Sequence, residues 1–385
     1  MSWELDIEHR SFQAVCRTFV DRHLRPAVGE AEALGCVPRQ LWKELGAAGM
    51  LGLLTPEEYG GSGGDQLAVA LLAEELARAS GGIAISPLDS AYMAAPHIAA
   101  YSSAEQRAAY LPRLARGESV AALAVTEPGA GSDVAAVTTS AVRDGTGWRL
   151  NGRKMFITNA GLADVLIVAA KTAPDAGPRG ISTFLVEAPT PGLSLGAPLP
   201  KMGWHAADTR EVILDDVAVP ATSLLGELNR GFYQIMHAFQ LERVVLAAMG
   251  LGHAAECLHL ATGHARIREA FGAPLTGLQS VRHRLAEMAV ELESARLMTY
   301  CAAQRLGAGH PQAPRSVAMA KYHTALAAGR IVDAAVQIFG GSGYLEESAV
   351  ARHYRDVRVL RIGGGADEIQ LEILSRELTP GRALP

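Results

Sequence analysis

The hydrophobic and polar positions follow a helical period over the first part of the chain. Apolar residues recur three and four positions apart between Ile7 and Gly117, most clearly in the run Leu67 to Ala79. Ser103, followed three residues later by Gln106, has the sequence of a capping box, which predicts the start of another helix. We therefore expect an all-helical first domain over residues 1–119.

The period changes near Val120. From there to Leu225 the chain holds short β-type runs between turns rich in Gly, Pro and Asp, namely VAALAVT, GWRLNGRKMFIT, DVLIVAAKT, STFLVEAP and REVILDDVAVP. The dipeptide Asn151-Gly152 is typical of a type I′ turn and predicts a hairpin between WRL and RKMFIT. No parallel βαβ alternation is present, so the pattern predicts a small antiparallel β-domain over residues 120–226 and argues against a doubly wound nucleotide-binding sheet.

After Leu225 the pattern is helical again. Long helices are expected over 231–264, 278–307 and 313–338, and a last pair within 350–378, with glycines and prolines at the joints. These helices predict a C-terminal bundle over residues 227–385. The predicted fold class is therefore α+β and multidomain, with a helical domain, an antiparallel β-domain and a bundle of long helices in that order.

The first of these long helices carries a carboxylate on an apolar stripe. Ile235, Phe239, Glu242, Leu246 and Met249 follow one another at steps of four, three, four and three, which places them on one side of the helix. Burial disfavours the charged form of a carboxylate and raises its pKa, and general bases are tuned in this way. The helix alone leaves two interpretations open. Glu242 either forms a buried ion pair with an Arg of another helix or acts as a general base.

Composition narrows the class of protein. Of 385 residues, 49% are hydrophobic and 19% charged, which indicates a globular protein with large internal or subunit interfaces. The net charge of -5, from 35 basic and 40 acidic residues, gives no electrostatic reason to expect a nucleic acid or membrane partner. The four cysteines form no CxxC, which is typical of reduced thiols in the cytoplasm. The sequence MSWELDIEHR carries acidic residues where a signal peptide would carry basic ones, and no apolar run approaches the length of a membrane span, so we expect a cytoplasmic protein.

Three glycine-rich segments are candidates for ligand binding. Val125 to Asp133 (VTEPGAGSD) ends the first β-run, and its glycines would let backbone N–H groups approach a ligand closely, although an ordinary Pro-Gly turn has the same composition. Gln337 to Tyr344 (QIFGGSGY) ends a helix and is also typical of a C-cap. Ile362 to Gln370 (IGGGADEIQ) precedes the last helix and puts backbone donors at its N-terminus.

Two further patterns mimic known sites. Gly60 to Gly64 fits GxSxG literally but follows an acidic turn rather than a strand, so it does not predict a nucleophile elbow. Candidate metal ligands gather on the long helix at His253, Glu256, Cys257 and His259. HExxH and paired CxxC are absent there, so the pattern favours a solvated helix face and no metal site is expected.

These segments, in this order, resemble the acyl-CoA dehydrogenase family over nearly the whole chain. The resemblance is carried by LGLLTPEEYGG, YLPRLARGE, AVTEPGAGSD, GRKMFIT, KMGWHAADT, REAFG, QIFGGSGY and RDVRVLRIGGGADEIQ. Each segment is weak alone, but the ordered set is specific. The resemblance implies a helical, β and helical fold, FAD as cofactor, and a homotetramer that binds FAD partly across subunits.

The resemblance also implies a role for Glu242. In this family a carboxylate base removes the α-proton of an acyl thioester while the β-hydride goes to flavin N5, which leaves a trans-2-enoyl thioester. Many members carry that base in the loop before the last helix, where this chain has Gly364. Isovaleryl-CoA and long-chain acyl-CoA dehydrogenases carry it on the long helix in a sequence like LERLVLAGG, and LERVVLAAMG puts Glu242 at that position. The enolate oxygen needs hydrogen bonds, implied to come from the flavin ribityl hydroxyl and the N–H of Gly364.

Further site residues are implied by position. Residues implied to meet the isoalloxazine and pyrophosphate are Val125, Thr126, Gly131 and Ser132, with Phe156 and Thr158 flanking the ring. Those implied to bind the adenine half of FAD, in a neighbouring subunit, are Arg268, Phe271, Gln279, Gln337, Gly340 and Gly341, and Glu368 completes the cofactor set. The thioester channel is implied to be lined by Ser132, Phe239, Arg243, Gly364 and Arg376. The sequence departs from the family pattern at two places. Ala366 replaces a threonine that often contacts FAD, and the Gly363–Gly365 run leaves room that a larger side chain would fill.

We therefore expect an FAD-dependent acyl thioester dehydrogenase of the fatty acid metabolism type that passes electrons to an electron-transferring flavoprotein. The acyl group is carried by CoA or by an acyl carrier protein, and a shifted chain would present a different C–C bond to the flavin. Acyl-CoA oxidases tend to be longer and are disfavoured. The alternative from another class is a non-catalytic DNA-binding flavoprotein. The excess of acidic over basic residues and the presence of Glu242 argue against it.

Overall fold

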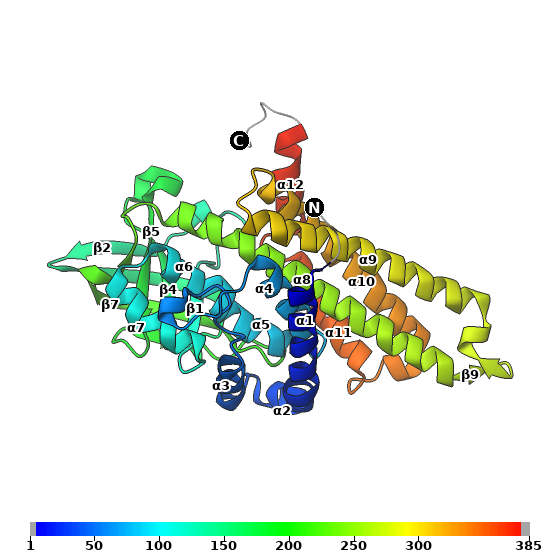
Figure 1. Ribbon diagram of the computed structural model, residues 1–385. Coiled ribbons are helices and arrows are strands. Elements are labelled where there is room, and N and C mark those ends of the chain that lie inside the picture. The colour runs from blue at the N-terminus through cyan, green and yellow to red at the C-terminus, as the bar shows by residue number, and fades with distance from the viewer. Residues whose placement is uncertain (1–4, 379–385) are drawn as a thin grey trace.

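Residues 5–378 of the chain are described by a computed structural model, in which helices, then strands, then helices follow one another (Figure 1). The first four and last seven residues, which the sequence analysis assigns to the terminal domains, lie outside this part. Helices end at Ala115, strands occupy the chain from Ala121 to Leu225, and helices resume at Gly231. The predicted fold class is confirmed.

The N-terminal region is entirely helical. Its helices are α1 (Ile7–Phe19), α2 (Arg25–Leu34), α3 (Arg39–Ala47), α4 (Gln66–Ala77), α5 (Gly81–Leu88), α6 (Ala95–Tyr101) and α7 (Ala104–Ala115), with π-helical turns at Val20–Leu24 and Asp89–Ala94. The predicted capping box opens α7, since the backbone N–H of Gln106 donates to Ser103 Oγ at 3.2 Å and that of Ser103 donates to Gln106 Oε1 at 2.9 Å. α4 is buried almost throughout and packs against the long helix α8 (Gly231–Ile267).

The middle region is one sheet with a mostly antiparallel topology. Its strands are β1 (Ala121–Ala124), β2 (Ser140–Asp144), β3 (Gly147–Thr158), β4 (Val165–Lys171), β5 (Ile181–Glu187), β6 (Leu193–Leu195), β7 (Thr209–Pro220) and β8 (Leu224–Leu225). They lie in the order β6-β7-β3-β2-β4-β5-β8, and β1 pairs with β4. Two pairings are parallel, β1 with β4 and the single pair Ser140–Lys171 between β2 and β4. The sheet therefore contains parallel contacts that the turn pattern did not predict.

The hairpin predicted at Asn151-Gly152 is wrong. β3 continues through both residues, and the turn that joins β2 to β3 lies between Asp144 and Gly147. At Gly152 the pairing of β3 with β7 shifts register, which marks a β-bulge. A Cβ on Gly152 would collide with Thr139, so this glycine serves a close approach of two backbones rather than a turn.

The C-terminal region is a bundle of long helices. Its elements are α8, the short pair β9 (Glu269–Ala270) and β10 (Ala273–Pro274), α9 (Gln279–Gly307), α10 (Ala313–Phe339), α11 (Ala349–Val357) and α12 (Asp367–Leu378). Figure 1 shows α8 running from the sheet to the far tip of the molecule, where β9 lies. Among the described residues, α8 is the one helix long and apolar enough to cross a membrane, and 78% of its most apolar window is buried inside the protein.

The position of α8 brings two hydrophobic cores together. Near its start, Ile235 packs with Val125, Ala130 and Val134 beside the first strand. Further along, α8 belongs to the large core that it shares with α4, α9 and α10. Residues in the first half of α8 therefore lie at the junction between the sheet and the two helical regions.

A buried ion pair fixes the loop that follows β1. Lys154 Nζ lies 2.8 Å from Glu127 Oε1, and their side chains are 0% and 4% exposed. Glu127 also accepts hydrogen bonds from the backbone N–H groups of Thr138 and Thr139 at 2.7 and 2.9 Å. Burial opposes ionisation of Glu127, but the attraction of Lys154 outweighs it and lowers the pKa of Glu127 to about 2. The segment Val125–Asp133 is thus anchored to β3.

We predict that Glu127→Gln lowers the free energy of unfolding by about 3–5 kcal/mol, because it leaves the Lys154 ammonium buried without a counter-charge. Urea denaturation of the apoprotein at neutral pH would measure this loss. The double substitution Glu127→Gln with Lys154→Met removes both charges and should recover part of it. A single variant that is as stable as the parent would show that the pair does not hold this loop.

Candidate active site

Glu242 projects from α8 at the junction of the three regions. Its side chain is partly buried, between Leu241 and Leu246, which are 8% and 4% exposed. Its carboxylate forms no hydrogen bond or ion pair with any residue in the described part of the chain. The ion-pair interpretation is therefore not what this structure contains, and the oxygens of Glu242 remain free to bind a ligand or a proton.

The cations closest to Glu242 are directed at a neighbouring loop. Arg243 Nε donates to the carbonyl of Gly364 at 3.1 Å, and Lys321 Nζ, on α10, donates to the carbonyl of Gly365 at 2.6 Å. The buried Gln370 Nε2 reaches the same two carbonyls at 3.3 and 2.9 Å. Three side chains from α8, α10 and α12 thus clamp the glycine loop beside Glu242.

This arrangement sets the protonation of Glu242. Burial raises the pKa of Glu242 to about 7, and the positive charges of Arg243 and Lys321 limit that rise. Burial also lowers the pKa of Lys321 to about 8, although Asp367 attracts its charge. A carboxylate with a pKa near 7 holds a proton reversibly at neutral pH, which is the property that a general base requires.

Gly364 leaves room for the Glu242 carboxylate. Its φ is +64°, in the left-handed region. A Cβ there would lie 2.5 Å from Leu246 Cδ1 and 3.3 Å from Glu242 Oε1, so a side chain at this position would compete with both. Within the described chain the backbone N–H of Gly364 has no acceptor. A free N–H therefore lies beside a free carboxylate, a pairing that suits a carbonyl oxygen next to an acidic C–H.

The loop after β1 and the end of β3 form a second part of the site. The Cβ positions of Gly129 and Gly131 face open space, and the N–H groups of Gly131 and Ser132 have no acceptor among the described residues. Phe156 is 66% exposed, with a φ of +61° at a second register shift of β3 against β7. An exposed ring beside uncommitted backbone donors fits a planar, polar-edged group such as an isoalloxazine. Thr126 and Thr158 lie alongside, partly buried.

The residues expected at the adenine half of FAD lie at the other end of the bundle. Arg268, Phe271 and Gln279 are all exposed around the β9–β10 turn, and Phe271 is 96% exposed. Phe339 stacks on His264 at 4.3 Å, which brings the exposed Gln337, Gly340 and Gly341 to the same end. At 1.5 Å per helical residue, Arg268 lies about 39 Å from Glu242. The predicted cofactor residues therefore form two separate groups within one chain.

The remaining predicted residues lie around the glycine loop or on the surface. Phe239 is partly buried on α8, one turn before Glu242. Glu368 is exposed in the first turn of α12. Arg376 is exposed on the same helix and is ion-paired with Glu372 at 3.0 Å. Neither Glu368 nor Arg376 forms a hydrogen bond or ion pair with Glu242 in the described part of the chain.

Sequence reasoning missed three side chains of the site. Lys321 and Gln370 hold the glycine loop, and the charge of Glu242 acts on Asp89, which lies on the π-helical turn after α5. A signal for Asp89 was present in the sequence, because it is the sole Asp, Glu, Lys or Arg between Arg78 and Glu105. Lys321 likewise interrupts an apolar stretch of α10.

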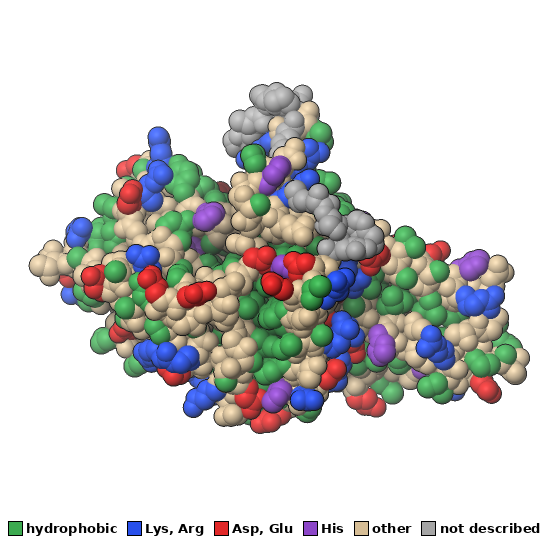
Figure 2. Space-filling model, in the orientation of Figure 1, with side chains coloured by type: hydrophobic (Ala, Val, Ile, Leu, Met, Phe, Trp, Pro, Cys, Tyr) green, Lys and Arg blue, Asp and Glu red, His purple; other side chains and the backbone are tan. Residues whose placement is uncertain are grey.

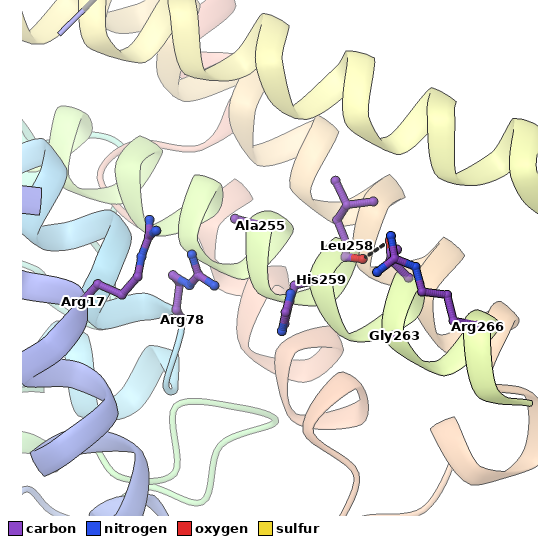
Figure 3. A pocket seen from close by; sticks show the side chains of 8 residues that line it. Arg17, Arg78, Ala255, Leu258, His259, Gly263 and Arg266 are labelled. Atoms are coloured by element: carbon purple, nitrogen blue, oxygen red, sulfur yellow. Dashed lines mark hydrogen bonds between the residues drawn. The ribbon is translucent and has the colours of Figure 1, made fainter. Parts of the chain in front are cut away.

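The surface hollow in Figure 3 is separate from this site. It has a volume of about 460 Å³ and is lined by Arg17, Arg78, Ala255, Leu258, His259, Thr262, Gly263 and Arg266. Arg17 is paired with Glu75 at 2.7 Å and Arg78 with Glu256 at 3.2 Å. Of the four metal-like residues on α8, His253 bonds to His353 and Glu256 to arginines, while His259 lines this hollow. These side chains therefore contact different neighbours.

Models of one known protein family match nearly the whole chain. The acyl-CoA dehydrogenase N-terminal domain matches residues 6–118, the middle domain residues 122–217 and the C-terminal domain residues 229–379. The three matches follow the helical, β and helical regions of the structure in order.

Individual proteins show the same similarity. A 3-(aryl)acrylate reductase of Clostridium sporogenes is 38% identical over 96% of this chain and 98% of its own length. The mitochondrial short-chain specific acyl-CoA dehydrogenase of Homo sapiens is 39% identical over 98% of this chain and 91% of its own length. The solved FAD complex of PigA superposes with a TM-score of 0.93 at 31% identity, over 98% of this chain and 99% of that one.

We predict that Lys321→Met moves the ionisation of Glu242 to higher pH, because it removes one of the two cations that oppose the rise of its pKa above about 7. A pH titration of the protonated carboxyl band by infrared difference spectroscopy would measure the shift, with Glu242→Gln as the blank that identifies the band. Arg330→Met is a matched control on the same helix, since Arg330 pairs with Glu291 at the surface. An unchanged midpoint in Lys321→Met, or an equal shift in the control, would contradict the assignment.

Proposed function

The chain belongs to the acyl-CoA dehydrogenase family, and we propose that Glu242 is the base with which it dehydrogenates an acyl thioester. The protein is an oxidoreductase and FAD is its cofactor. The observation that carries the proposal is the unpaired carboxylate of Glu242, whose pKa of about 7 lets it take up a proton at neutral pH.

In the proposed mechanism this chain supplies a base and a hydrogen-bond donor. Ionised Glu242 removes the α-proton of the thioester, and the N–H of Gly364 donates to the thioester oxygen as negative charge develops there. Arg243, Lys321 and Gln370 keep that N–H in place through the loop carbonyls. Phe156 and the Val125–Ser132 loop would hold FAD when it is bound, and FAD would supply the two-electron oxidant for the hydrogen on the β-carbon.

We further propose that the acyl group is carried by CoA or an acyl carrier protein and that electrons leave to an electron-transferring flavoprotein. On the face shown in Figure 2, acidic and basic side chains are interspersed rather than gathered into a field of one sign. Together with the net charge of -5, this disfavours the DNA-binding alternative. We place the enzyme in the cytoplasm on the composition of the chain.

We propose a homotetramer because the two groups of cofactor residues lie too far apart to hold one FAD molecule. The group near Arg268 would then bind the adenine half of a neighbour's FAD. Ile267, Phe271 and Val290, at this end of the bundle, are 82%, 96% and 67% exposed, which supports an interface there.

A second candidate is the reverse reaction, the reduction of an unsaturated acyl group. It is favoured by the similarity to a 3-(aryl)acrylate reductase. The same residues would serve, because protonated Glu242 would return the proton that it removes in the forward direction. Reoxidation of the chemically reduced enzyme by an enoyl thioester, faster than its bleaching by the saturated ester, would favour this direction.

We predict that Glu242→Gln retains FAD but reduces its flavin at least about 100-fold more slowly, because the base is lost while the shape of the site is kept. In the parent, the reduction rate should rise about tenfold between pH 6 and pH 8, since the active form of Glu242 is the one that exists above its pKa of about 7. Stopped-flow absorbance under anaerobic conditions measures both. Parental rates in the variant would exclude Glu242 as the base.

We expect anaerobic bleaching of the visible flavin band when the holoenzyme meets its substrate. The panel consists of straight and branched acyl-CoAs and the same acyl groups on a carrier protein. Bleaching by a CoA ester would support an acyl-CoA dehydrogenase, and bleaching by carrier-bound groups alone would place the enzyme with carrier-protein pathways. Holoenzyme whose flavin is bleached by no member of the panel, and whose reduced flavin is reoxidised by no enoyl thioester, would contradict the proposed function.

A further inference from the structure

Asp89 is the second carboxyl group of the active site, and the mechanism does not use it. It begins the π-helical turn Asp89–Ala94, which packs against α8 and β1, and it is 8% exposed. π-Helical turns often occur at functional sites because they redirect side chains out of the regular helical pattern. A charged residue inside an otherwise uncharged, buried segment is costly, so its retention calls for a physical reason.

The protein satisfies only one oxygen of Asp89. Asn159 Nδ2 donates to Asp89 Oδ2 at 3.3 Å, a long hydrogen bond, and makes a shorter one of 2.8 Å to the Ser86 carbonyl. Oδ1 of Asp89 has no partner among the described residues. Asn159 directly follows Thr158 at the end of β3, so this hydrogen bond ties Asp89 to the strand that carries the expected flavin wall. The turn that carries Asp89 also packs against α8, the helix of Glu242.

Two nearby carboxyl groups cannot both ionise easily. Burial raises the pKa of Asp89 well above its ordinary value, and the charge of Glu242 raises it further. Glu242 is in turn flanked by Arg243 and Lys321, which favour its own ionisation. Burial and the charge of Glu242 therefore both favour the neutral form of Asp89. A neutral carboxyl group can donate one hydrogen bond and accept others, and a hydroxyl group complements it.

We propose that Asp89 selects an acyl chain that bears a hydroxyl group, by supplying the hydrogen bond that its free oxygen lacks in the protein. This inference rests on the proposed function, because it assumes that the acyl group lies between Glu242 and Phe156. The α- and β-carbons are occupied by the reaction, so the hydroxyl belongs on C4 or C5. An unsubstituted chain would leave the buried carboxyl of Asp89 unpaired and would bind more weakly.

Binding without turnover tests this assignment directly. In Glu242→Gln holoenzyme, perturbation of the flavin spectrum reports the Kd of butyryl, 4-hydroxybutyryl, valeryl and 5-hydroxyvaleryl thioesters on the carrier that the parent accepts. We expect at least one hydroxylated ester to bind about 10- to 100-fold more tightly than its unsubstituted counterpart. Asp89→Leu, added to this background, should remove the preference. Asp89→Asn keeps the shape and a hydrogen-bonding group, so it should keep most of the preference and controls for folding, together with FAD content.

The outcomes separate this inference from the function on which it rests. Equal Kd values for the hydroxylated and plain esters, or a preference that survives Asp89→Leu in protein with full FAD content, would overturn the role of Asp89 while leaving the dehydrogenase intact. Parent enzyme whose flavin no thioester reduces, and which no enoyl ester reoxidises, would overturn the proposed function and this inference with it.

Discussion

The candidate active site depends on a carboxylate that is kept without a partner inside a helical bundle. Glu242 lies within the field of Arg243 and Lys321, and either cation could have neutralised it. Both cations instead donate to carbonyl groups of the glycine loop, and Gln370 donates to the same two carbonyls. The charges therefore stabilise ionised Glu242 from a distance without blocking it. The same contacts fix the N–H of Gly364, so basicity and the position of the hydrogen-bond donor come from one set of interactions.

Much of the fold could be predicted because its long elements have strong local signals. α9 and α10 were expected over 278–307 and 313–338 and are found at Gln279–Gly307 and Ala313–Phe339, since glycine and proline mark their ends. β2, β6 and β8 were missed because they are short or exposed and carry little alternation. The hairpin predicted at Asn151-Gly152 was wrong because Gly152 packs closely against Thr139, a residue outside the dipeptide on which the prediction was based.

The candidate site was only partly predictable for a related reason. Periodicity could place Glu242 on a buried stripe but could not say what lies opposite it, because that depends on packing between helices far apart in sequence. The structure supplies the missing neighbours, namely Lys321 on α10 and Asp89 on the turn after α5. Asp89 could have been noticed in the sequence because it is an isolated charged residue in an apolar run. The direction of the Lys321 side chain could not be predicted from the residues next to it. The roles of Glu242 and of the two groups of cofactor residues stay predictions.

The missing side chain of Gly364 has an energetic consequence. A Cβ at this position would lie 2.5 Å from Leu246 and 3.3 Å from Glu242, so the space beside the loop admits a carboxylate from the helix or a side chain from the loop, but not both comfortably. The φ of +64° adds to the exclusion. Substitutions at the two positions should therefore be energetically coupled, so that the residue tolerated at one depends on the residue present at the other.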